Sequence, residues 1–398
     1  MTDDDLSTRL IHHAYRPPGG FEAVAPGVYK ASTVIFPDVH ALRTYDWKDK
    51  SGYTYGLHGT PTTFTLEQRI ATLEGGEHCL LAPSGLAVIS LVDMALLRSG
   101  DEVLLPDNVY GPSKTFAEVE LVAWGITPRF YDPMDPQDLA AKIGPATRLV
   151  WLEAAGSVTL EFPDVPALVA RVREANAQRR GEHAIVTAMD NTWGAGIAFN
   201  AFDLGADISV HALTKYPSGG ADVLMGSVVT RDLALHRKIL LTRMRLGLGV
   251  GSNDAELVLR GLSSMSLRYH AQDASTRELA AWMQAQPDVL RVLHPALPGS
   301  PGHDAWRRDA RGAACLFTAV FDAAIPRERI DAFCDRLRVF RLGWSWAGPI
   351  SLCAPYDPRS LRGQPWPGVG GLVRFAVGLE AVQDLRADLA QALDALRA

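Results

Sequence analysis

The chain has few cysteines, and their spacing does not suggest pairing. Cys79, Cys315, Cys334 and Cys353 are scattered over 398 residues without a CxxC motif. This distribution is typical of reduced thiols and indicates neither a disulfide framework nor a cysteine-ligated metal site. None of the 11 histidines stands in an HExxH motif or a comparable ligand spacing, so we expect no bound metal.

The chain also lacks an excess of positive charge, a long apolar run and a basic leader. Its net charge of −6 provides no field that would attract nucleic acid or anionic lipid. No apolar run is long enough to span a bilayer, and the acidic start of the chain does not have the layout of a secretion signal. We therefore expect a cytoplasmic protein whose partners are small molecules and copies of itself, not nucleic acid or membrane.

The order of sequence patterns predicts an arm and two α/β domains. Residues 1–58 are rich in glycine, proline and aromatic residues and have weak periodicity, which predicts an arm that packs on a neighbouring subunit. Strands and helices alternate over 59–255, which indicates a mostly parallel sheet with helices on both faces. Three successive helices are expected within 233–286. A final strand–helix–strand–helix pattern predicts a smaller α/β domain over 256–398.

Two strand ends carry the residues that are the strongest candidates for catalysis. An apolar strand over 208–213 runs into a turn containing Lys215, and the preceding strand ends at Asp190. Taken alone, Lys215 would be interpreted as a solvent-facing lysine. A partly desolvated lysine is a nucleophile, however, and a carboxylate on the neighbouring strand end suits pyridoxal phosphate (PLP). The aldehyde of that cofactor needs an amine, and its ring nitrogen needs an acid to stay protonated.

Three further stretches fit such a site, and each also has a simpler structural explanation. The N–H groups of Gly85 and Leu86 open a helix and could hold a phosphate with Thr214, although most such turns are simply N-caps. Tyr110 follows another strand end and could lie on a pyridine ring, or be an ordinary core or surface tyrosine. Arg374 interrupts an apolar strand, so its charge needs either a buried ion pair or a ligand carboxylate.

Several motifs together resemble the Cys/Met metabolism family of PLP-dependent enzymes. The four that carry the resemblance are Tyr55-Gly56-x-x-Gly59-Thr60-Pro61-Thr62, Asp190-Asn191-Thr192-Trp193, Thr214-Lys215-Tyr216 and Val373-Arg374-Phe375-x-x-Gly378-Leu379-Glu380. Three more are similar to the bacterial cystathionine β-lyase branch of that family: Glu153-x-x-Gly156-Ser157-x-Thr159-x-Glu161, His294-Pro295-Ala296-Leu297-Pro298-Gly299-Ser300 and Trp344-Ser345-Trp346-x-Gly348. The similarity extends from roughly residue 5 to the C-terminus.

This resemblance implies the fold-type I PLP-dependent transferase-like architecture. We expect an N-terminal arm, a large PLP domain around a mostly parallel seven-stranded sheet with helices on both faces, and a smaller C-terminal α/β domain. The resemblance also implies a homotetramer, built as a dimer of dimers, in which two subunits share each active site.

The same resemblance assigns catalytic roles to three residues. Lys215 would carry the cofactor as a Schiff base and move the substrate proton, Asp190 would pair with the pyridine nitrogen, and Tyr110 would stack on the ring and contact the substrate. Other residues would contact the phosphate or the substrate. The phosphate would be held by Gly85, Leu86, Thr214 and, from the neighbouring subunit, Tyr55; the substrate would be held by Arg374, Ser345 and Trp346.

Two positions depart from the family pattern. Leu57 stands where relatives commonly have an arginine that grips the phosphate, and His58 follows it. Losing a charged contact of this kind costs on the order of 1.5–3 kcal/mol, so we expect either compensation by His58 or another group, or weaker cofactor binding. Gly220 stands where relatives usually have a histidine, in a turn to which we assign a structural role.

The function implied by the resemblance is β-elimination of L-cystathionine to homocysteine, pyruvate and ammonia, a step in methionine biosynthesis. The sequence leaves open γ-elimination or γ-replacement on the same scaffold, a broader cysteine-S-conjugate β-lyase, and a PLP-fold protein that has lost catalysis. A dinucleotide-dependent oxidoreductase is disfavoured because no GxGxxG motif follows the first strand.

Overall fold

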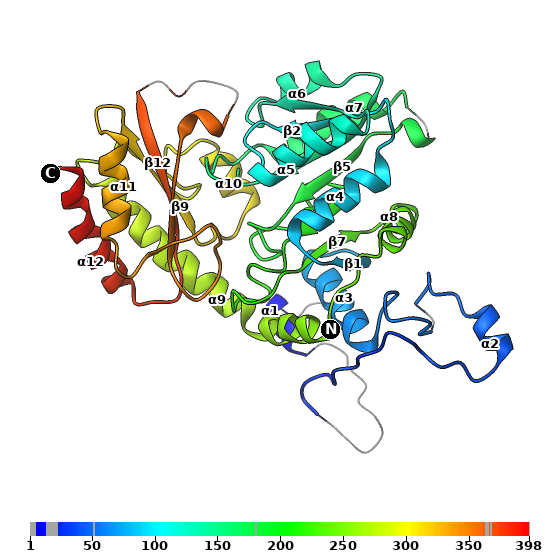
Figure 1. Cartoon of the computed structure of the whole chain (residues 1–398). Helices are drawn as coiled ribbons and strands as arrows, with labels where there is room; N and C mark the ends of the chain where they lie inside the picture. The colour runs from blue at the N-terminus through cyan, green and yellow to red at the C-terminus, as the bar shows by residue number, and fades with distance from the viewer. Residues whose placement is uncertain are drawn as a thin grey trace.

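The computed structural model describes residues 5–12, 23–50, 52–179, 181–362, 366 and 368–397. These residues form two α/β units, each built around one sheet, and an extended N-terminal segment (Figure 1). None of the described helices combines the length and apolar composition needed to cross a membrane. All four cysteines are buried and free, and no cluster of metal-ligating side chains occurs in the described part of the chain.

The first unit contains a seven-stranded sheet with the order β1-β7-β6-β5-β4-β2-β3. β7 runs antiparallel to both of its neighbours, and every other pair is parallel. The predicted mostly parallel sheet of seven strands is therefore confirmed. Its strands are β1 (His78–Ala82), β2 (Glu102–Pro106), β3 (Thr127–Tyr131), β4 (Thr147–Glu153), β5 (Val186–Asp190), β6 (Ile208–His211) and β7 (Gly226–Thr230).

Helices cover both faces of this sheet, and the alternation of side chains along β4 shows how. Leu149 and Trp151 pack in one core cluster with α4 and α8, whereas Val150 and Leu152 pack in another with α3 and α7. Because successive strand residues point to opposite faces, a strand that is apolar throughout needs cover on both sides. The helices of this unit are α3 (Pro61–Glu74), α4 (Gly85–Leu96), α5 (Gly111–Phe116), α6 (Pro136–Lys142), α7 (Val165–Asn176) and α8 (Leu233–Leu246).

The second unit contains a five-stranded sheet with the order β10-β11-β12-β9-β8. Val373 and Phe375 of β12 pack on one face with α11, α12 and the end of α9. Leu372 and Ala376 face the other way and belong to the core cluster of the first unit. The elements are β8 (Arg291–Leu293), α10 (His303–Asp309), β9 (Leu316–Asp322), α11 (Arg327–Arg336), β10 (Arg341–Leu342), β11 (Leu352–Tyr356), β12 (Val369–Ala376) and α12 (Val382–Leu393).

One long helix, α9 (Ser252–Gln284), runs from the first unit into the second (Figure 1). The prediction of three helices within 233–286 is wrong, because only α8 and α9 occupy that stretch. α8 ends where Gly247 adopts a left-handed φ of 66°. Gly261 does not break α9. A Cβ at this glycine would lie 2.1 Å from the carbonyl oxygen of Pro217, so the glycine lets the helix pack against the chain just after Lys215.

The described part of the N-terminal segment contains two short helices, α1 (Leu6–Ile11) and α2 (Val39–Thr44). α1 packs on α3 and α9. The stretch around α2 leaves large apolar side chains in solvent, among them Ile35 and Leu42. Packing of this segment on a neighbouring subunit stays a prediction.

Candidate active site

The candidate site lies where neighbouring strands of the seven-stranded sheet end. β5 ends at Asp190, and its neighbour β6 ends at His211, four residues before Lys215. β6 is two residues shorter than predicted because the chain turns there: the Lys215 N–H donates to the carbonyl of Ala212 at 3.0 Å. The carboxyl ends of parallel strands share one edge of the sheet, so the two residues lie at the same rim.

Lys215 reaches from this turn toward residues of the second unit. Its Nζ donates to Oγ of Ser345 at 2.9 Å and lies 5.3 Å from the ring centroid of Trp346. Burial, followed by the positive charge of Arg374, lowers the pKa of Lys215 to about 8. An amine with this pKa has an appreciable neutral, nucleophilic fraction at neutral pH.

Asp190 has one carboxylate oxygen engaged and one open. Oδ1 accepts hydrogen bonds from the backbone N–H of Thr192 at 2.9 Å and from its hydroxyl at 2.6 Å. Oδ2 has no hydrogen-bond partner among the described residues. The Thr192 hydroxyl oxygen in turn accepts from the N–H of Ala212 at 2.9 Å, which ties the Asp190 turn to the Lys215 turn. Burial raises the pKa of Asp190, and the hydrogen bonds from Thr192 oppose that shift.

Tyr110 enters the site from the turn after β2. Its backbone N–H donates to Oε2 of Glu153 at 3.0 Å, and Glu153 is the last residue of β4. The Tyr110 side chain is 41% exposed. Burial raises the pKa of its hydroxyl, and the nearby carboxylate of Asp190 adds to that increase while Arg374 opposes it. From the sequence, Glu153 is recognised only as part of a family motif and receives no role in the site, although it ends a buried strand just as Asp190 does.

Arg374 is 6% exposed and has no carboxylate partner in the described part of the chain. Its Nη2 donates to the carbonyl of Trp344 at 3.0 Å, and Nη1 donates to the carbonyl of Ser157 at 3.4 Å. The guanidinium carbon lies 5.4 Å from the ring centroid of Tyr356. A buried ion pair, one of the two explanations for this arginine, is therefore not observed. Its positive charge is open to an anionic ligand.

The start of α4 presents a cradle for an anion beside the Lys215 turn. The N–H groups of Gly85 and Leu86 have no hydrogen-bond partner among the described residues, and Ser84 caps the helix through the N–H of Ala87 at 3.0 Å. A Cβ at Gly85 would lie 2.7 Å from the Cβ of Ala212, so only glycine allows this close approach. The Thr214 hydroxyl donates to the carbonyl of Met225 at 3.2 Å, so its role toward a phosphate stays a prediction.

The segment around Tyr55 does not join these residues by any contact described within one chain. Tyr55 is 46% exposed, and its role across a subunit interface stays a prediction. The carbonyl of Leu57 accepts from Nη1 of Arg243 at 3.1 Å. His58 stacks on Trp47 with ring centroids 4.5 Å apart. Burial, helped by the charge of Arg243, lowers the pKa of His58, so this imidazole is a poor replacement for a charged guanidinium.

The side chains brought together fit PLP. Lys215 offers a buried amine for the aldehyde, and Oδ2 of Asp190 is free to accept a hydrogen bond from a protonated ring nitrogen. The two free N–H groups at the start of α4 suit a phosphate, because helix N-termini favour anions.

Comparisons with known proteins agree with this assignment over nearly the whole chain. The profile of the family described as Cys/Met metabolism PLP-dependent enzyme matches residues 7–394. The cystathionine beta-lyase of Bordetella avium is 39% identical over 396 residues, covering 98% of this chain and 97% of its own. The L-alanine/L-glutamate racemase of Wolbachia pipientis wMel is 32% identical over 380 residues, covering 92% of each chain. The crystal structure of metB from Corynebacterium glutamicum superposes with a TM-score of 0.89 at 27% identity, covering 99% of each chain.

Proposed function

Because the chain belongs to the Cys/Met metabolism family of PLP-dependent enzymes, we propose that it is a carbon–sulfur β-lyase that cleaves L-cystathionine to homocysteine, pyruvate and ammonia. The observation that carries the proposal is the way adjacent residues of one loop hold the two cationic groups of the site. The carbonyl of Trp344 binds the guanidinium of Arg374, and the hydroxyl of Ser345 binds the amine of Lys215.

This arrangement supports binding of an α-amino acid. Arg374 has a buried, planar guanidinium without an acidic partner, which suits an α-carboxylate. A carboxylate bound there would bring the adjacent Cα toward Lys215, because the two cationic groups are held by neighbouring residues. Ser345 and Trp346, which contact Lys215, would then face the substrate side chain.

The pKa values of Lys215 and Tyr110 indicate how protons would move in the site. Lys215, with a pKa of about 8, can take the Cα proton at its Nζ and later return a proton to the departing sulfur. The raised pKa of Tyr110 keeps its hydroxyl protonated, so it could serve as a second proton donor in the site. The bound cofactor supplies the electron sink for the charge released at Cα, and the carboxylate of Asp190 keeps its ring nitrogen protonated.

We further propose that a second copy of the chain completes the site, within a cytoplasmic homotetramer. The support is the exposed apolar surface of the N-terminal segment together with the exposed side chain of Tyr55. A neighbouring subunit that covers this surface would bury both.

The test is the keto acid that the purified, PLP-loaded protein releases from L-cystathionine. Pyruvate with homocysteine is the expected result, and Lys215→Ala should abolish it while the far-UV circular dichroism stays unchanged. 2-Oxobutyrate with cysteine would instead identify γ-elimination. Loss of optical activity from L-alanine or L-glutamate, without any keto acid from cystathionine, would assign the protein to racemisation and overturn the proposal.

A further inference from the structure

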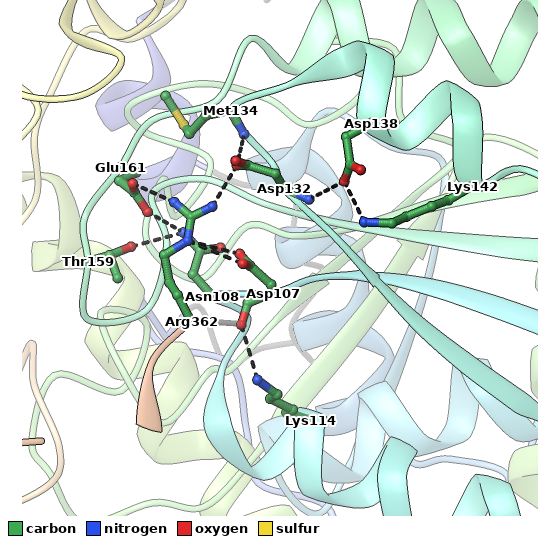
Figure 2. Close-up of polar contacts among 10 residues, drawn as sticks. All are labelled: Asp107, Asn108, Lys114, Asp132, Met134, Asp138, Lys142, Thr159, Glu161 and Arg362. Carbon is green, nitrogen blue, oxygen red and sulfur yellow. Dashed lines mark hydrogen bonds and ion pairs between the residues drawn. The ribbon is translucent and has the colours of Figure 1, made fainter. Parts of the chain in front are cut away.

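A buried arginine outside the catalytic residues connects the second unit to the first. Arg362 lies in the connection between β11 and β12, and its side chain is 8% exposed. Nη1 contacts Oε1 of Glu161 at 2.6 Å, Nη2 contacts Oδ1 of Asp132 at 2.6 Å, and Nε contacts Oδ1 of Asp107 at 3.2 Å. Figure 2 shows the guanidinium between the three carboxylates.

The three carboxylates come from three separate connections at one edge of the large sheet. Asp107 follows β2, Asp132 follows β3, and Glu161 lies in the connection after β4. These strands are neighbours in the order β4-β2-β3, so their carboxyl ends bring the three acids together. Like charges this close repel one another, and the fork of one guanidinium can bind several carboxylates at once.

Two of these connections lead directly to residues of the active site. Asp107 begins the turn that carries Tyr110. Asn108 in the same turn donates through Nδ2 to Oε2 of Glu161 at 3.0 Å and to the Thr159 hydroxyl at 2.9 Å. The connection after β4 also includes Ser157, whose carbonyl accepts from Arg374. Arg362 therefore holds together the two segments that flank the site.

The local electrostatics give Arg362 a large effect on these segments. Burial raises the pKa of Glu161, and the charge of Arg362 opposes that shift. Lys114 donates to the backbone carbonyl of Asp107 at 3.4 Å. Without Arg362, the three acids would lose the guanidinium that neutralises them, and repulsion would push the Tyr110 turn away from the connection after β4.

We propose that Arg362 is a positioning residue, which aligns Tyr110 and Arg374 for the amino-acid substrate by clamping the turn after β2 to the connection after β4. The inference rests on the proposed amino-acid site, but not on which reaction follows binding. A displacement of about 1 Å between reacting groups can reduce turnover about 100-fold, which sets the size of effect that this clamp could have.

A matched control exists in Arg308 of α10. It also links the second unit to the first, through bonds of 2.9 and 3.0 Å to Asp164, and it also contacts Asp309. Asp164 caps the start of α7, and the described contacts of Arg308 involve none of the catalytic or substrate-binding residues proposed above. Substitution of Arg308 therefore removes an ion pair between the units, more exposed than those of Arg362, without touching the segments that flank the site.

The experiment measures glycine binding to the PLP-loaded protein, by titration of the cofactor absorbance, together with turnover of the sulfur amino acid. Glycine has the carboxylate and amine but no leaving group, so its dissociation constant reports alignment alone. Arg362→Met should weaken glycine binding and lower kcat/KM by about 10- to 100-fold, Arg362→Lys should lose less, and Arg308→Met should stay within about twofold of wild type.

The outcomes separate positioning from a structural role. If Arg362→Met lowers only the melting temperature, with glycine affinity and kcat/KM as in wild type, the proposal is wrong. If Arg362→Met does not fold, Arg362→Lys decides by the same two measurements. A wild-type protein that binds glycine but releases no keto acid from cystathionine would contradict the proposed reaction and leave the test of Arg362 intact.

Discussion

The amine of Lys215 offers a direct test of how burial prepares this site for chemistry. Burial and the charge of Arg374 lower its pKa from 10.5 to about 8. This shift corresponds to roughly 3 kcal/mol in favour of the neutral amine, at about 1.4 kcal/mol per pKa unit. At about pH 7.5, about a quarter of the Lys215 side chains would be neutral, compared with about one in a thousand for an ordinary lysine.

The assay is labelling of the cofactor-free protein with a limiting amount of an amine-acylating reagent over a range of pH, quantified by peptide mass analysis. Labelling of Lys215 should rise with a midpoint near pH 8, and the exposed Lys238 of α8 corrects for reagent reactivity in the same digest. Arg374→Gln should move the midpoint upward, because it removes the second cause of the shift. A wild-type midpoint above about pH 10 would refute the reasoning, since Lys215 would then titrate like a solvated lysine.

Three further predictions concern substrate binding, pH-dependent stability and backbone packing. In steady-state kinetics, Arg374→Gln should raise KM for the amino-acid substrate by about 10- to 100-fold, because the variant loses a charge-assisted contact worth about 1.5–3 kcal/mol. An unchanged KM would exclude Arg374 from carboxylate binding. Burial raises the pKa of Asp93 to about 7, so its contribution to stability is full below the unfolded pKa near 4 and is lost as pH rises through 7. Asp93→Asn can still accept a hydrogen bond from Nε1 of Trp151. Its stability, measured by thermal unfolding, should rise relative to wild type by about 3 kcal/mol from pH 5 to pH 8, and a stability difference independent of pH would count against the shift. Gly261→Ala forces a Cβ against the Pro217 carbonyl and should cost about 1–3 kcal/mol of stability. Thermal unfolding measures this loss, with Ser263→Ala as the exposed control on the same helix. Equal melting temperatures of the two variants would show that α9 can shift freely.

The parts of the site that follow simple strand geometry could be predicted from the sequence. Asp190 ends one apolar strand and Lys215 follows the next. Neighbouring parallel strands end at one edge of a sheet, so the proximity of the two residues follows from the pattern. The same rule applies to Glu153 at the end of β4, which only a closer comparison of strand ends would have found.

The parts that depend on long-range contacts could not be predicted in this way. Arg362 binds three acidic side chains that are 201 to 255 residues away in the chain. α9 continues through Gly261, which packs against the chain beyond Lys215, and helical periodicity does not encode this contact. The strands β8 and β10 have three and two residues, too few to produce an alternating pattern.

Because β12 is buried on both faces, destabilisation of either unit should affect it. Leu372 and Ala376 belong to the core of the first unit, and Val373 and Phe375 belong to the core of the second. Arg374 therefore lies in a strand that is packed against a core on both faces. A destabilising substitution in the core of either unit therefore disturbs the proposed carboxylate-binding residue through this one strand. Heat or denaturant should then abolish substrate affinity abruptly, together with the first loss of packing in either half, rather than weaken it by degrees.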